Sequence, residues 1–221
     1  MTALPLLLSL LLITPQQPAT PDVDAMLREA RAEIQSFEKA GGKKDDPNHP
    51  VEKWVPALWA LRVSKATSEA VHLLIHADRF RDAQARADQL APDDPAWEGL
   101  AQVLFEAASL QKDFTYLLAK VPAVLSKAPD GKVRAALQLS LGRGWRAQKD
   151  DQKAKAAFEA AIEAARESTF GKQAETELYE LLHLGPGQSA PQFSATAVDG
   201  SQVSLAGYRG KPVVLVFWAT H

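Results

Sequence analysis

The sequence predicts a mixed α and β protein, with an all-helical domain over residues 21–184 and the first strands of a second domain over residues 185–221. Three observations support this prediction. Apolar residues recur at three- and four-residue spacing through the first part, as one face of a helix requires. A linker rich in Gly and Pro, from Gly185 to Pro191, then interrupts the pattern. Short strand signals follow that linker.

The first predicted helix shows the spacing clearly, because Val23, Met26 and Ala30 fall on one helical face. Gly41-Gly42 ends this helix. Eight further helices are predicted at about residues 52–63, 67–77, 80–90, 95–110, 114–127, 133–148, 153–166 and 172–184.

Paired aspartates occur before several predicted helices. Asp45-Asp46 and Asp93-Asp94 each precede a proline, and Asp150-Asp151 precedes the helix predicted at 153–166. An Asp side chain caps free N–H groups at a helix start, and Pro at the first helical position has no N–H to satisfy. We therefore interpret these carboxylates as caps or turns and not as an acid/base pair.

Small and aromatic residues alternate over residues 141–161 in a way typical of two closely packed helices. The residues that carry this pattern are Leu141-Gly142, Trp145, Ala154, Phe158 and Ala161. At this spacing the segment resembles one tetratricopeptide helix–turn–helix unit, although Gln138 and Arg166 stand where that motif has Trp and Pro. The resemblance implies an irregular helical-repeat (tetratricopeptide-like) domain. A plain helical bundle is the alternative.

After the linker, Phe193 to Val198 and Gln202 to Leu205 are predicted strands, and Asp199-Gly200 between them is a typical hairpin turn. A second turn at Tyr208 to Lys211 precedes the run from Val213 to Trp218. Because this run has no polar alternation, we expect a strand that is buried on both faces.

Four short motifs occur in order along this segment. They are Gly187-x-x-Ala190-Pro191-x-Phe193, then Asp199-Gly200, then Leu205-x-x-Tyr208-Arg209-Gly210-Lys211, and finally VVLVFWAT from Val213 to Thr220. Together they resemble the start of a bacterial thioredoxin-like (redoxin) domain of the TlpA or AhpC/TSA-like type. The resemblance implies an incomplete thioredoxin-like fold, with an entry hairpin and then the central strand that leads to the redox helix.

In that family a Cys-x-x-C pair follows the central strand, and the helix N-terminus stabilises the first thiolate. The resemblance implies disulfide exchange with protein thiols and disulfides. The 221 residues contain no cysteine, so we expect this chain to be inactive by itself and to be part of a longer protein. A genuine stop that leaves a redox-dead protein is the alternative. A peroxiredoxin-like peroxidase, with a single peroxidatic cysteine, is a further one.

The first 20 residues form a separate apolar leader. Its run from Leu4 to Ile13 is too short to cross a bilayer, so no transmembrane span is expected, but it suits the core of a signal peptide. No Lys or Arg precedes the run, and no Ala-x-Ala cleavage site follows it. We predict export to the periplasm or outside the cell. A short uncleaved anchor and a misassigned start are the alternatives.

Composition narrows the classes of partner. The 25 Lys and Arg residues nearly balance 27 Asp and Glu residues, for a net charge of -2, and form no basic stripe. This argues against nucleic acid as a partner, since phosphate binding needs clustered cations. The lack of cysteine excludes disulfides and zinc–thiolate sites within these residues. No cofactor is expected.

His72 and His76 lie four residues apart and so share a helical face, a spacing compatible with a metal. The residues between them lack the Glu of a zinc protease, and beyond Asp78 no third ligand lies nearby in the sequence. We interpret both as surface histidines. Gly142-Arg143-Gly144 is attributed to close helix packing and not to dinucleotide binding.

The remaining candidates are also assigned to structure. Core packing is expected for Trp54, Trp59, Trp97 and Trp145, and His221 would tune a neighbouring cysteine only in a longer chain. No residue is assigned to a catalytic, cofactor-binding or metal site. The favoured hypothesis is an exported thiol–disulfide oxidoreductase whose helices bind a protein partner. Its rival is a helical-repeat binding module with a vestigial redox segment.

Overall fold

A computed structural model describes residues 22–129, 131–216 and 218–219. The predicted leader over residues 1–20 lies outside the described residues, as do Phe217, Thr220 and His221. Within the described residues, no helix combines the length and the apolar character needed to cross a membrane.

Nine helices occupy the described part of the chain up to His183, one for each helix that the periodicity predicts. Their ends differ from the predicted ends by a few residues. The helices are α1 Val23–Lys39, α2 Val51–Ala60, α3 Ser64–His76, α4 Phe80–Ala87, α5 Trp97–Gln111, α6 Thr115–Leu125, α7 Lys132–Ala147, α8 Asp151–Ala165 and α9 Thr169–His183.

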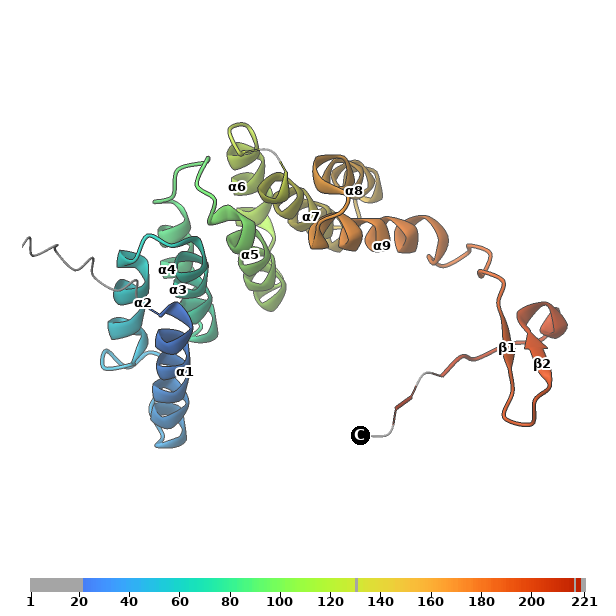
Figure 1. Ribbon diagram of the computed structural model, residues 1–221, viewed down its shortest axis with the longest axis horizontal. Coiled ribbons are helices and arrows are strands. Elements are labelled where there is room, and N and C mark those ends of the chain that lie inside the picture. Colours follow the sequence, from blue (N-terminus) through green and yellow to red (C-terminus); the bar gives the residue numbers. More distant parts are fainter. Residues whose placement is uncertain (1–21, 130, 217, 220–221) are drawn as a thin grey trace, which may run out of the picture.

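The helices follow one another along the long axis of the molecule, from α1 to α4 at one end, through α5 to α7, to α8 and α9, and the segment with β1 and β2 lies beyond α9 (Figure 1). Each odd-numbered helix contacts the next odd-numbered one, so that α1, α3, α5, α7 and α9 form one row. The even-numbered helices pack against members of this row: α2 and α4 contact α3, α6 lies between α5 and α7, and α8 lies between α7 and α9. The helices therefore form two layers.

Two apolar clusters fill the space between the helices, and partly buried Trp145 and Phe170 pack against both. Trp97 in the larger cluster and Phe158 in the smaller one are the largest fully buried side chains. Trp54 and Trp59 are also buried, which confirms the core role predicted for three of the four tryptophans. Trp145 is only partly buried, and the Lys153 ammonium lies 4.2 Å from its ring centroid.

The Gly142-Arg143-Gly144 motif lies where α7 packs against two neighbours. A Cβ atom on Gly142 would lie 2.5 Å from Cε1 of Phe158 in α8, and one on Gly144 would lie 3.0 Å from Cδ2 of Leu117 in α6. The two glycines therefore allow α7 to approach helices on both sides. This confirms that the motif serves helix packing.

Several helix starts show the expected capping chemistry. Asp150 caps α8 by accepting a hydrogen bond from the Lys153 N–H, and Ser168 caps α9 by accepting one from Gly171. Asp46 and Asp94 instead accept from the backbone N–H two residues ahead, which makes turns that precede α2 and α5. They lie outside the helices, because each helix begins a few residues after its proline.

The chain changes to strand after α9. Strand β1 (Ser194–Thr196) pairs antiparallel with β2 (Gln202–Ser204), with Ala195 opposite Val203. Gly200, with φ of +83°, makes the connecting turn, and the Asp199 carboxylate accepts hydrogen bonds from Ser201. A short 3-10 helix, η1 (Leu205–Tyr208), follows. The predicted hairpin and second turn are confirmed, with strands shorter than predicted.

The buried strand predicted over Val213 to Trp218 is wrong for the described residues of this run. None of them is assigned to a strand, and Val214 and Trp218 are 84% and 81% exposed. Figure 1 shows this run leaving the hairpin as an extended segment with no strand drawn beside it. A strand buried on both faces needs a paired strand on each side and covering helices. The hairpin supplies neither to the described residues of this run.

Candidate functional site

A chain of polar contacts joins each odd-numbered helix to the next. Arg31 of α1 donates to Glu69 of α3 at 3.0 Å, and the His72 Nε2 atom of α3 lies 3.1 Å from an oxygen of Glu106 in α5. From α5, the Gln102 amide donates to the buried Ser140 hydroxyl of α7 at 3.0 Å. We call the row of helices α1, α3, α5, α7 and α9, together with the polar groups that link them, the inner face.

At the C-terminal end of the inner face, Arg143 makes contacts with two neighbouring helices. From α7 it donates to Glu177 of α9 at 2.7 Å and to the Gln102 side-chain oxygen of α5 at 2.9 Å. Arg146, one turn further along α7, donates to the other oxygen of Glu177 at 2.6 Å and to Glu180 at 3.2 Å. One guanidinium therefore links three helices, and two carboxylates neutralise the two arginines.

A hollow of about 440 Å³ lies beside this cluster and is lined by Phe105, Arg143, Arg146, Ala147 and Glu177. The Arg143 guanidinium carbon lies 5.8 Å from the centroid of the Phe105 ring, within the range of a cation–π contact. The hollow combines an aromatic surface with paired charges. Such a surface suits contact with a polar protein segment.

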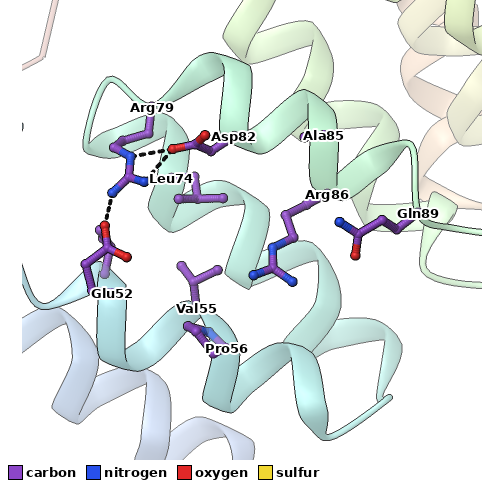
Figure 2. Close-up of a pocket in the computed structure, with 10 residues that line it drawn as sticks. Glu52, Val55, Pro56, Leu74, Arg79, Asp82, Ala85, Arg86 and Gln89 are labelled. Atoms are coloured by element: carbon purple, nitrogen blue, oxygen red, sulfur yellow. Dashed lines mark hydrogen bonds and ion pairs between the residues drawn. The ribbon is translucent and has the colours of Figure 1, made fainter.

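A second pocket of about 310 Å³ lies between α2 and α4 (Figure 2). Arg79 forms ion pairs with Glu52 and Asp82 at its rim, and the hydrogen bond with Glu52 in particular raises the pKa of Arg79. Val55 and Leu74 form an apolar floor. Arg86 lies across the pocket, with its guanidinium carbon 5.3 Å from the Trp59 ring. The contacts of Arg79 and Arg86 therefore hold α4 and the residue before it against α2, and they account for the charged groups of this pocket.

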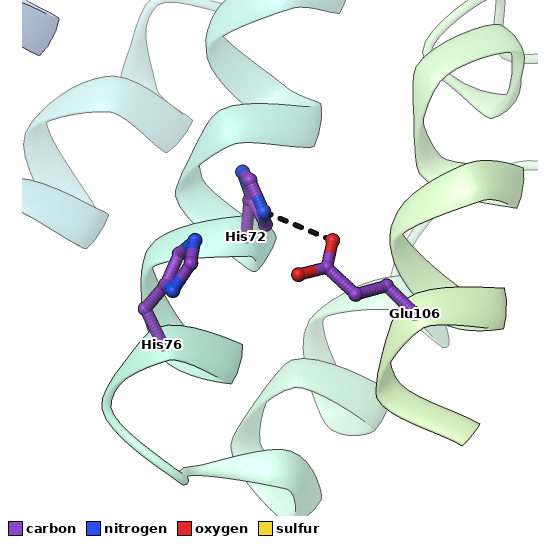
Figure 3. Close-up of side chains that lie close together, drawn as sticks. All are labelled: His72, His76 and Glu106. Carbon is purple, nitrogen blue, oxygen red and sulfur yellow. Dashed lines mark ion pairs between the residues drawn. The ribbon is translucent and has the colours of Figure 1, made fainter. Parts of the chain in front are cut away.

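The two histidines that the sequence singles out lie together, as their spacing predicts. The ring centroids of His72 and His76 are 4.4 Å apart. Glu106 of α5 joins them, so that ligand-type atoms of all three side chains lie within 4.8 Å of one another (Figure 3). Asp78, the third ligand considered from the sequence, instead forms an ion pair with Lys44 at 2.9 Å.

Glu106 is the residue that sequence reasoning missed, because it lies 30 positions beyond His76 on another helix. In the apolar spacing of the helix predicted over residues 95–110, Glu106 is only one of the polar positions. The pKa of His72 is raised, chiefly by the neighbouring Glu69 carboxylate and also by Glu106, against the opposing effect of partial burial.

The C-terminal segment presents a hairpin, a short helical turn and an exposed apolar run, in that order. Residues 186–221 match the AhpC/TSA family. The match covers the segment in which the four motifs occur and supports a thioredoxin-like (redoxin) domain there. At the level of this family, the match supports a thioredoxin-like or peroxiredoxin-like function.

The helical part has no such match. No curated protein and no solved structure matches the chain. The polar inner face, the pocket beside Arg79 and the His72–His76–Glu106 group therefore have to be interpreted from their own geometry. None of these groups includes a thiol, because the 221 residues contain no cysteine.

Proposed function

We propose that residues 186–221 belong to a thioredoxin-like domain that acts in thiol–disulfide exchange, and that the helices bind the protein on which this domain acts. The observation that carries the proposal is the ordered set of redoxin motifs, which coincides with the family match and with the β1–β2 hairpin. The hairpin is the part of that fold that comes before its central strand.

The proposed reaction needs two cysteines at the N-terminus of the helix after that strand. The helix dipole lowers the pKa of the first thiol, and its thiolate attacks one sulfur of a substrate disulfide. A mixed disulfide forms while the other substrate sulfur leaves as a thiolate. The second cysteine then displaces the remaining substrate thiol, so that the domain is oxidised and the substrate is reduced. Any such thiols are outside the 221 residues.

A peroxiredoxin-like peroxidase is the second candidate, because the matching family is AhpC/TSA. In that reaction one thiolate attacks the O–O bond of a peroxide. The product is a sulfenic acid on the protein, and an alcohol or water leaves. The Phe-Trp-Ala-Thr run from 217 to 220 favours the dithiol reaction, since it resembles the lead-in to a Cys-x-x-C pair.

The inner face supports the second half of the proposal. It spans α1, α3, α5, α7 and α9, and it carries partly buried charges that are already oriented by hydrogen bonds. Stacked helix pairs commonly use such a continuous surface to bind protein segments. We propose that the helices are tetratricopeptide-like, an interpretation supported by the close packing of Phe158 on Gly142.

We propose further that the protein is exported, on the basis of the apolar leader between Leu4 and Ile13. An oxidising compartment also suits disulfide exchange. Fractionation of cells that express the native gene, followed by mass analysis of the N-terminus, tests this step. A protein that stays in the cytoplasm with residues 1–20 intact contradicts it.

The deciding experiment is to isolate the protein from its native gene and to measure its intact mass, its thiol content and its activity. Two reactive thiols and reduction of insulin disulfides support the oxidoreductase. A single essential thiol and consumption of hydroperoxide support the peroxidase. The 221-residue chain is the matched control, because it has no thiol. A native product without a reactive thiol contradicts both functions.

A further inference from the structure

Three side chains with metal-binding chemistry meet where α3 packs against α5. His72 and His76 project from successive turns of α3, and Glu106 reaches them from α5 (Figure 3). One atom of each side chain lies within 4.8 Å of the chosen atoms of the other two, and the His72 Nε2 to Glu106 Oε2 distance is 3.1 Å. Two imidazoles and one carboxylate are a donor set that suits zinc.

We propose that His72, His76 and Glu106 bind one divalent transition-metal ion, Zn²⁺ in the first place. In a tetrahedral site, ligand atoms at about 2.0–2.1 Å from the ion lie about 3.3 Å from one another. The His72–Glu106 pair already has a separation close to this value. His76 is exposed, and one of its ring nitrogens lies within 4.8 Å of the ligand-type atoms of the other two side chains.

A carboxylate also lies near the ring edge of His72 that faces away from Glu106, where a metal-bound histidine usually has a hydrogen-bond partner. A ligating imidazole usually presents its second nitrogen to a carboxylate, which fixes the ring and makes the first nitrogen a better donor. The Nδ1 atom of His72 lies 3.7 Å from Glu69, on the opposite edge of the ring from Glu106. Glu69 is held in turn by Arg31 of α1 at 3.0 Å. Three helices thus contribute to the arrangement.

The two imidazole rings lie in contact, with centroids 4.4 Å apart. A neutral imidazole offers a lone pair to a cation. An ion pair between His72 and Glu106 would not account for the position of His76 beside them. A metal ion bound by all three side chains would account for it.

An ion at this position would be reachable from solvent. His72 and His76 line a groove of about 410 Å³ whose other walls come from α1 and from the segment around Lys44. Three protein ligands leave a fourth position for water or for a group on a partner, in contrast to closed structural sites with four protein ligands. The inference is independent of the thiol chemistry proposed above.

The test is zinc binding by the 221-residue chain, made without a histidine tag and stripped with a chelator. Competition against a chromophoric zinc indicator is expected to give one Zn²⁺ per chain. Replacement of Zn²⁺ by Co²⁺ is expected to give the strong visible absorption of a tetrahedral site. The variants His76→Ala and Glu106→Gln are each expected to weaken zinc binding by about ten-fold or more, and Glu69→Gln by about ten-fold.

His183→Ala is the matched control, since His183 is another exposed histidine in the last turn of a helix. It is expected to leave zinc affinity unchanged. Circular dichroism establishes that each variant folds, and His76→Gln replaces His76→Ala if it does not. The proposal is overturned if the chain fails to compete for zinc with the indicator. It is also overturned if the His76 and Glu106 variants bind zinc as tightly as the His183 variant.

Discussion

Phe158 occupies the space that a side chain on Gly142 would need. A Cβ atom at position 142 would lie 2.5 and 2.6 Å from two carbons of the Phe158 ring, which is fully buried. The contact joins α7 to α8 and places a glycine in the interior of a helix. Glycine there costs about 1 kcal/mol relative to alanine, so the close approach has to compensate for that cost.

The variant Gly142→Ala is therefore expected to lower the free energy of unfolding by about 1–3 kcal/mol, despite the better helix propensity of alanine. The measurement is urea unfolding followed by circular dichroism. Gly144→Ala is the comparison and is expected to cost less, since the closest contacts of its Cβ would be the flexible ends of Leu117 and Leu118, at 3.0 and 3.1 Å. A Gly142→Ala protein as stable as the parent would show that the two helices separate easily.

Asp88 of the α4 C-terminus ties this helix to α6. It accepts a hydrogen bond from the Tyr116 hydroxyl at 2.9 Å and pairs with Lys120 at 2.7 Å. Partial burial raises the pKa of Asp88, but Lys120 and Tyr116 together outweigh it and hold the pKa below the usual value of 3.8. Burial above all, together with Asp88, raises the pKa of Tyr116.

A lowered carboxyl pKa stabilises the fold at pH values above the unfolded pKa, and this contribution is lost as the pH falls through the folded pKa. Asp88→Asn is therefore expected to reduce stability near pH 7. The difference from the parent should shrink as the pH falls below about 3.8, the ordinary pKa of an aspartate carboxyl, and disappear below the lowered pKa of Asp88. Urea midpoints measured from neutral to strongly acidic pH test this expectation. A difference that persists unchanged in strong acid would mean that packing, and not charge, is responsible.

Zinc should also stabilise the helices if His72, His76 and Glu106 bind it. Ligand at 100 times its dissociation constant adds about 2.7 kcal/mol to the free energy of unfolding. Thermal unfolding with and without zinc measures the effect. We expect the gain in the parent and in His183→Ala, and its loss in His76→Ala. An equal gain in stability in all three proteins would show that zinc binds at a different site.

The apolar run from Val213 is expected to make the 221-residue chain self-associate. Val214, Val216 and Trp218 are 84%, 74% and 81% exposed, and uncharged apolar segments of high β-propensity pair with one another. The double variant Val214→Lys, Val216→Lys should lower light scattering at high protein concentration. Val198→Lys, which changes another fully exposed valine beside the hairpin turn, should have little effect.

Local patterns in the sequence predict most of the secondary structure. Apolar spacing predicts each described helix to within a few residues, and Asp199-Gly200 predicts the hairpin turn. Both signals act over a few neighbouring residues, where backbone hydrogen bonding and side-chain spacing decide the conformation. The redoxin motifs are equally local, and the family match covers the same residues.

Those local patterns do not predict contacts between residues on different helices. Glu106 meets His72 because α3 and α5 pack side by side, and Arg143 meets Glu177 because α7 and α9 do. The predicted strand at Val213 failed for the same reason, since a buried strand exists only when paired neighbours cover it. Local chemistry thus determines which residues are helical and where the hairpin turn falls. Packing between elements decides which side chains share a site.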